Sequence, residues 1–261
     1  MTNMLITLLR LSPAETLAYF FRLRYSLNYS VILRCNIVTV EGDCIPRNFQ
    51  QTHENLLQCA KEQFLAFGFE RASIREICKE AHVTNGAFYN HFTDKEALFG
   101  AIVDPVFQTI SQMYNTAAAE QFALVKNDDL LQLWKHEEET LCSMIEYIYA
   151  HFEIFQLLLM CSAGTKYADF QDMVVRAEMR ETKKFLAELK RRGIPFRDLE
   201  DDEWHILVHA HYASLAELVL HNYPKETALK YAHTLAAFFE AGWKAVLGLP
   251  VMEGSKLRQQ P

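Results

Sequence analysis

Apolar residues recur along most of this chain with the period of an α-helix. In the stretch after Gln51, Leu56, Ala60 and Phe64 are four residues apart, and Leu57 and Phe67 extend the same pattern. This spacing places apolar side chains on one face of a helix. Gly68 follows at the position where a glycine commonly ends a helix. We therefore expect a first helix that ends at Gly68, after which Phe69 packs back toward the core.

The stretch from Ser73 to Glu96 predicts two short helices joined by a tight turn. Ile74, Ile77, Cys78 and Ala81 give the first of them a single apolar stripe. Residues 85–92 predict the second, with buried phenylalanines at positions 88 and 92. Two short helices with a tight turn between them form the helix-turn-helix, whose second helix enters the DNA major groove.

Two helix starts are also encoded in this stretch. Ser73 with Glu76, and Thr93 with Glu96, have the Ser/Thr-x-x-Glu spacing of a capping box. In that motif the hydroxyl and the carboxylate each accept a hydrogen bond from a free backbone N–H of the first turn. We expect both boxes to form, with the second one starting a fourth helix.

The rest of the chain also reads as helices. Pro105 falls inside the pattern of the fourth helix, which predicts either a kink that serves as a hinge or a helix boundary. The longest stretch with the alternation typical of a strand is residues 36–40, so the expected fold is all-α. The further helices are expected at residues 128–150, 152–161, 168–192, 201–222 and 224–247.

Composition and charge narrow the class of protein. Half of the 261 residues are hydrophobic, which is enough for a substantial core, and no apolar run is long enough for a membrane span. The net charge is −7, and residues 53–100 hold five Lys and Arg against seven Asp and Glu. Any affinity for DNA must therefore come from where a few cations and backbone amides point. The six cysteines show no C-x-x-C spacing and are interpreted as buried thiols, with a redox-sensing thiol as the open alternative.

Residues 83–99 resemble the signature of the TetR family of transcriptional regulators. The most specific part is Tyr89-x-His91-Phe92-x-x-Lys95-x-x-Leu98. The resemblance implies an N-terminal helix-turn-helix domain and a C-terminal helical domain for ligand binding and dimerisation. We expect an N-terminal extension of uncertain structure at residues 1–48, these two domains at 49–100 and 101–252, and a flexible tail at 253–261.

The same resemblance assigns a face of the second short helix to DNA. Asn can pair with adenine and Thr can bond to base edges or phosphate, while Tyr, His and Lys can donate to phosphate. Gly86 lets the backbone approach the groove, and Ala87 offers a methyl contact at most. The candidate DNA-binding residues are Thr84, Asn85, Gly86, Ala87, Tyr89, Asn90, His91 and Lys95, with Ser73 and Arg75 as further phosphate candidates.

The helices after residue 128 hold two further candidate sites. Aromatic side chains in the middle helices could line a small-molecule pocket, and the apolar surface of the last two helices could form a four-helix bundle with a second copy. The predicted pocket consists of Trp134, Tyr147, Phe152, Phe155, Tyr167, Phe170 and Tyr212. The predicted dimer interface consists of Trp204, Leu215, Leu218, Leu235, Phe239 and Trp243.

The expected function is that of a cytoplasmic, homodimeric repressor that binds a palindromic DNA operator and is released by a small molecule. No nucleophile–base motif, phosphate-binding loop or HExxH sequence occurs, so we expect no enzyme activity and no cofactor. His205 and His209 have a spacing that can chelate a metal. No further ligand is in register with them, so we expect no metal site. The alternative is an α-helical interaction protein whose helix-turn-helix contacts protein.

Overall fold

The computed structural model describes residues 47–126 and 130–248, and all regular elements in these ranges are α-helices. This confirms the predicted all-α class for the described part of the chain. The predicted tail, and nearly all of the predicted extension, lie outside these residues. The helices are α3 (Arg47–Arg71), α4 (Ile74–Glu80), α5 (Asn85–Phe88), α6 (Lys95–Lys126), α7 (Leu130–Ala150), α8 (Phe152–Met160), α9 (Phe170–Arg191), α10 (Asp201–Leu220) and α11 (Lys225–Leu247).

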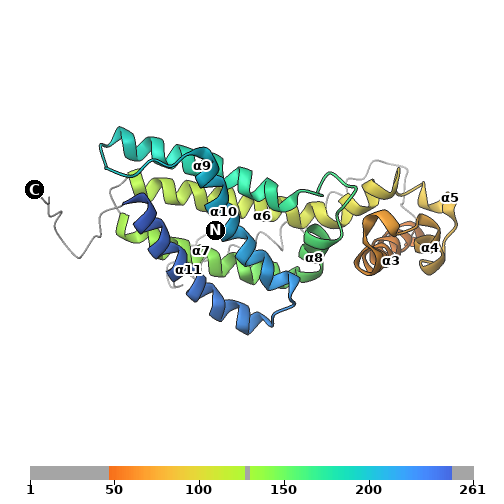
Figure 1. Cartoon of the computed structure of the whole chain (residues 1–261). Coiled ribbons are helices and arrows are strands. Elements are labelled where there is room, and N and C mark those ends of the chain that lie inside the picture. The colour runs from red at the N-terminus through yellow and green to blue at the C-terminus, as the bar shows by residue number, and fades with distance from the viewer. Residues whose placement is uncertain (1–46, 127–129, 249–261) are drawn as a thin grey trace, which may run out of the picture. The chain divides into compact units, whose positions relative to one another are not determined.

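Gly68 breaks α3 as the sequence predicts. Its backbone has φ +75° and ψ 162°, a conformation that favours glycine. The break turns Phe69 inward, where its side chain is buried and its N–H donates to the carbonyl of Cys161 at 2.9 Å. Phe67 was predicted on the apolar face but is 47% exposed, because the chain turns away directly after it. We call α3 with α4 and α5 the helix-turn-helix head (Figure 1).

The caps of these short helices differ from the prediction. Ser73 stands at the start of α4, but its side chain makes no capping hydrogen bond. Thr84 caps α5 instead, since its Oγ1 accepts from the N–H of Ala87 at 3.1 Å. At the start of α6 the cap is Asp94, whose Oδ1 accepts from Ala97 N–H at 2.7 Å. Both predicted capping boxes are therefore wrong: Ser73 makes no side-chain cap on α4, and Asp94, the neighbour of Thr93, caps α6.

The second short helix is shorter than expected but keeps its buried face. Its helical residues end at Phe88, and the chain continues as a turn to residue 91. Backbone bonds from Asn90 N to Ala87 O and from Phe92 N to Phe88 O continue the winding. Phe88 and Phe92 are both buried, as predicted.

Helix α6 joins the head to the other helices. It runs through Pro105 without a break, so the alternative of a helix boundary at this proline is wrong. The role of the proline as a hinge stays a prediction. In Figure 1, α6 extends from the head along α7 and α9.

The core is divided unequally. One large cluster joins the head to α6, α8 and the start of α9, with Phe64, Ile77, Phe99 and Leu157 among its fully buried members. Two smaller clusters lie farther along, one between α9, α10 and the end of α11, the other between α7, α10 and α11. None of the described helices is long and apolar enough to cross a membrane.

Candidate nucleic-acid interface and ligand cavity

The polar rim of α5 forms the candidate interface. Thr84, Asn85, Gly86 and Asn90 are exposed, and Tyr89 is 59% exposed. The fully buried Phe88 anchors this rim from below. The head therefore presents short polar groups on a well-packed base, which is how a helix-turn-helix offers side chains to a groove.

Two small residues shape this rim. The hydrogen bond from Ala87 N–H uses one lone pair of the Thr84 hydroxyl. The hydrogen of that hydroxyl can still be donated to an acceptor outside the protein. A Cβ added at Gly86 would meet only Thr84 Oγ1, at 3.8 Å, which is ordinary contact. The fold of the protomer therefore does not require glycine there. Ala87 is half-buried, so its methyl group lies partly against the head.

His91 lies at the edge of the rim. Its ring is half-buried and lies 5.5 Å from the ring of His53, which stacks on Phe92 at 4.8 Å. Burial lowers the pKa of His91, and the neighbouring His53 lowers it further. A neutral imidazole has one N–H to donate.

Lys95 has a different role from the predicted one. Its Nζ donates to the carbonyls of Phe69, Glu70 and Ala72, at 2.6, 3.1 and 3.0 Å. It also lies 4.4 Å from the centre of the Phe69 ring. These three bonds use every N–H of the ammonium group. Lys95 therefore ties the turn after α3 to the start of α6, and this geometry leaves no donor for the predicted phosphate contact.

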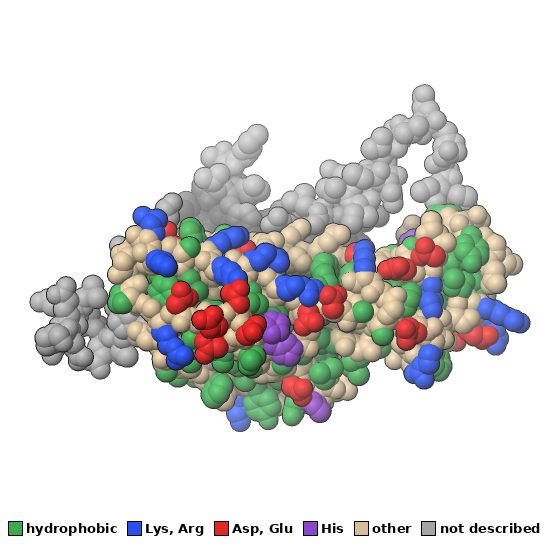
Figure 2. Space-filling view, turned by 45° about the horizontal axis from the view of Figure 1, so that its top comes forward, with side chains coloured by type: hydrophobic (Ala, Val, Ile, Leu, Met, Phe, Trp, Pro, Cys, Tyr) green, Lys and Arg blue, Asp and Glu red, His purple; other side chains and the backbone are tan. Residues whose placement is uncertain are grey.

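Cations near the rim are few and scattered. Arg75 and Ser73 are exposed at the start of α4. Arg71 donates from Nε to the carbonyl of Phe67, and Lys79 pairs with Glu76 at 3.2 Å. On the face drawn in Figure 2, acidic and basic side chains alternate. Arg75, exposed at the start of α4, stays a candidate for a phosphate contact.

A second candidate site is a cavity of about 860 Å³ lined by residues of α6, α7, α9, α10 and α11. Of the residues predicted for the pocket only Tyr212 is among its described walls. The side chain of Trp134 lies outside the described residues. The others pack into the large core cluster, so their assignment to the pocket is corrected. These core residues are Tyr147, Phe152, Phe155, Tyr167 and Phe170.

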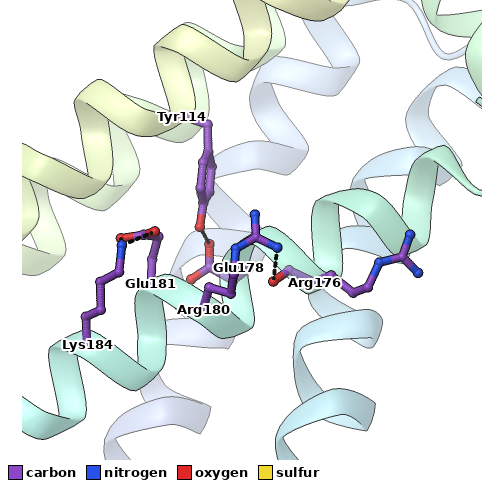
Figure 3. Close-up of polar contacts among 6 residues, drawn as sticks. All are labelled: Tyr114, Arg176, Glu178, Arg180, Glu181 and Lys184. Carbon is purple, nitrogen blue, oxygen red and sulfur yellow. Dashed lines mark hydrogen bonds and ion pairs between the residues drawn. The ribbon is translucent and has the colours of Figure 1, made fainter.

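Glu178 is the polar centre of this cavity. Its Oε2 accepts from the hydroxyls of Tyr114 and Tyr212, at 2.7 and 2.8 Å. Tyr114 and Glu178 point toward each other between α6 and α9 (Figure 3). Burial raises the pKa of Tyr114, and the negative charge of Glu178 raises it further. Tyr114 therefore remains a protonated donor to the carboxylate.

Sequence reasoning missed Glu178, although a signal was present. On α9, Val174, Glu178 and Thr182 follow each other at intervals of four, on the face that also carries the apolar Phe185. A carboxylate on an apolar face marks a buried polar site. His211 was missed too. Burial lowers the pKa of His211 to about 4, and its ring stacks on Phe239 at 4.2 Å.

The residues predicted for the dimer interface are largely used inside the protomer. Trp204 and Leu218 are 6% and 5% exposed, so their own chain covers them and their assignment is corrected. Trp204 stacks on Trp243 at 5.5 Å. The remaining three, Leu215, Leu235 and Phe239, are half-buried. Both last helices have two apolar faces, and the sequence pattern does not tell which one faces inward.

Histidines and cysteines form no further centre in the part of the chain that the structure describes. The rings of His205 and His209 lie 6.1 Å apart, and no group of three potential metal ligands is found among the described residues. Four described cysteines are free thiols, and burial raises their pKa, which disfavours the reactive thiolate. These are Cys59, Cys78, Cys142 and Cys161.

Known proteins resemble the head. Residues 56–102 match the family model described as bacterial regulatory proteins, tetR family. Over 60 residues the chain is 43% identical to the A-factor receptor protein of Streptomyces griseus, covering 23% of this chain and 22% of that protein. Over 54 residues it is 43% identical to the HTH-type transcriptional regulator UidR of Escherichia coli (strain K12), covering 21% and 28%. The chain thus matches less than a third of the length of these curated relatives, and the match confirms the resemblance predicted from residues 83–99.

Among solved structures, a TetR-family regulator from Syntrophomonas wolfei is 19% identical. It covers 74% of this chain and 96% of its own, with a TM-score of 0.49. At that score the likeness carries no argument about function.

Proposed function

We propose that this chain is a sequence-specific DNA-binding transcriptional regulator, because residues 56–102 match the family model of bacterial regulatory proteins of the tetR family. It acts as a repressor in the cytoplasm and has no enzyme activity. The observation that carries the proposal is the exposed polar rim from Thr84 to Asn90, held on the buried Phe88. Asn85 and Asn90 are suited to read base edges, while Tyr89 and Arg75 are suited to phosphates.

The regulator binds a palindromic operator as a homodimer. A helix-turn-helix reads one half-site, so a symmetric pair is needed for two half-sites about one turn of DNA apart or more. A surface for pairing runs along α11, where Tyr231, Leu235, Phe238 and Gly242 follow each other at intervals of three or four residues. Tyr231 and Phe238 are 40% and 70% exposed. Exposed apolar residues at this spacing fit a helix bundle across a twofold axis.

The homodimer can be tested by charging this face. Phe238→Glu should convert the dimer into a monomer in sedimentation at micromolar concentration, because a carboxylate would be buried unpaired at the seam. The control is Met160→Glu, at a residue of α8 that is 54% exposed and far along the sequence from α11. It should leave the dimer intact. A monomeric parent protein, or an unchanged Phe238→Glu dimer, would contradict the proposed interface.

A small molecule in the cavity between α6, α7, α9, α10 and α11 releases the operator. Helix α6 supplies Tyr114 and Phe122 to the cavity and begins beside the head, where Lys95 is tied to Phe69. A ligand in the cavity that shifts α6 therefore also moves the head at the other end of this helix. To work, it must bind the DNA-incompetent state more tightly, typically by about 1–3 kcal/mol.

DNA binding is tested by capturing fragments of genomic DNA with the purified protein at two salt concentrations. The expected result is a small set of fragments that share an inverted repeat and are retained at the higher salt concentration. Capture of random fragments only at low salt would indicate non-specific attraction. Capture of none would favour a helical interaction protein.

A further inference from the structure

One carboxylate at the cavity has neutral partners only. The Oε2 of Glu178 accepts from the hydroxyls of Tyr114 and Tyr212, as described above, and its Oε1 lies 3.3 Å from the hydroxyl of Thr182. Among the described residues, no lysine, arginine or histidine forms an ion pair with Glu178. An ionised carboxylate away from bulk water is costly without a counter-charge. Among the described residues, Glu178 therefore has no positively charged counter-ion.

The other charges around the cavity are already paired. Glu181 accepts from Lys184 at 2.7 Å, and Glu188 accepts from Arg191 at 2.6 Å. The described lining contains three carboxylates and two cations, so it carries one uncompensated negative charge, at Glu178. Figure 3 shows Lys184 turned to Glu181, while the nearby Arg180 bonds to the backbone carbonyl of Arg176 at 3.2 Å.

The remaining walls are mostly aromatic and apolar, with Asn115, Gln121, Thr140 and Thr182 as neutral polar members. Trp204 and Trp243 form a stacked pair, and Phe185 and Phe122 add two more rings. His211 brings no positive charge at neutral pH, because burial lowers its pKa to about 4. Faces of aromatic rings attract cations, most strongly when water is excluded. The volume of about 860 Å³ is sufficient for a drug-sized molecule.

We infer that this cavity takes a lipophilic organic cation, with Glu178 as its counter-ion and the aromatic rings around its apolar groups. The inference deepens the proposed function, on which the regulatory meaning of this binding rests. Binding itself does not depend on DNA and is measured without it.

The test uses two probes of the same shape and opposite charge, tetraphenylphosphonium and tetraphenylborate. Trp204 and Trp243 line the cavity, so quenching of tryptophan fluorescence reports occupancy. We expect tetraphenylphosphonium to bind saturably, with one site per protomer. Tetraphenylborate should bind at least roughly tenfold more weakly, because it would face Glu178 with a like charge.

Matched variants locate the charge. Glu178→Gln keeps the size of the side chain and should weaken tetraphenylphosphonium roughly 10- to 100-fold, the range of a lost charge-assisted contact. Glu181→Gln is the control, since that carboxylate also lines the cavity but is paired with Lys184. It should change the affinity less than threefold or so. Glu178→Asp keeps the charge and should retain the preference for the cation.

Several outcomes would overturn the inference. These are equal or tighter binding of the borate, absence of cation binding to the unmodified protein, or an unchanged affinity in a folded Glu178→Gln protein. The comparison of the two probes needs no variant, so it stands even if Glu178→Gln fails to fold. A final step adds tetraphenylphosphonium to the protein bound to its captured DNA. Binding without release would leave the cation site standing and contradict the proposed regulation.

Discussion

The helix-turn-helix head and the cavity region treat polar groups in opposite ways. In the head the buried side chains are apolar and the polar ones are exposed, and Lys95 at the start of α6 donates only to backbone carbonyls of the head. Around the cavity, Glu178 and His211 are turned inward among aromatic rings. In the head, a core filled with apolar groups holds the exposed polar rim in place. A partly polar cavity gives up some of that packing and gains a place for a ligand.

Truncating a ring in each region should give the largest contrast. Phe64 is fully buried in the head, and Phe64→Ala should lower the free energy of unfolding by about 3–5 kcal/mol, through lost burial and a new void. Phe122 is 38% exposed at the cavity, and Phe122→Ala should cost roughly 1 kcal/mol or less. Urea denaturation measures both. Equal losses of unfolding free energy in the two variants would contradict the contrast between a fully packed head and a loosely packed cavity region.

The half-buried His211 makes the stability of the cavity region sensitive to acid. Burial lowers the pKa of His211 to about 4 from 6.5, so between these values the unfolded chain binds more protons. Stability from this group is complete above about pH 6.5 and falls as pH decreases toward 4. At pH 5 the loss should reach up to about 2 kcal/mol. His211→Leu should remove this contribution to the loss of unfolding free energy between pH 7.5 and 5. An unchanged pH dependence of stability in His211→Leu would contradict the role given to His211.

Lys95, the first residue of α6, extends the comparison, because its half-buried ammonium group lies against the head and is satisfied by three backbone carbonyls there. Burial lowers the pKa of Lys95, while Glu70 opposes the shift. Lys95→Met keeps the apolar stem and leaves three carbonyls without this donor, so we expect a loss of about 1–3 kcal/mol in unfolding free energy. Arg75→Met, at an exposed cation of the same head, should cost about 0.5 kcal/mol or less. Equal stability of the two variants would argue against the clamp.

The smallest expected effect on stability is at Gly86. A Cβ there meets no close atom, and alanine restricts the unfolded chain more than glycine does. Gly86→Ala should therefore leave stability unchanged or raise it by about 0.4–1 kcal/mol. Thermal unfolding followed by circular dichroism measures this. A destabilised Gly86→Ala protein would show that the glycine serves the fold.

The two regions were also unequally predictable from the sequence. The head follows from local signals: Ala60 and Phe64, spaced i, i+4, and the paired Phe88 and Phe92 are buried as expected, and Gly68 breaks the helix as expected. Even there, the sequence could not show whether Lys95 reaches outward or back, because its partners are carbonyls some 25 residues earlier in the chain.

The cavity region depends on how long helices rotate against each other. Trp204 and Leu218 fit an outward or an inward face equally well by spacing, and tertiary packing turns them inward. Tyr167 and Phe170 are aromatic, as pocket walls commonly are, but they fill the core beside α6. Glu178 meets Tyr114 across 64 residues, a pairing that no periodicity encodes.

The most direct test of the proposed reading surface is the affinity of Gly86→Ala and Tyr89→Ala for a captured DNA fragment. Both changes lie on the exposed rim, so the fold should persist in each. We predict that both variants bind the fragment at least roughly tenfold more weakly than the parent, with Tyr89→Ala also showing a shallower salt dependence. Two folded variants that bind the fragment like the parent would contradict the assignment of this rim to DNA.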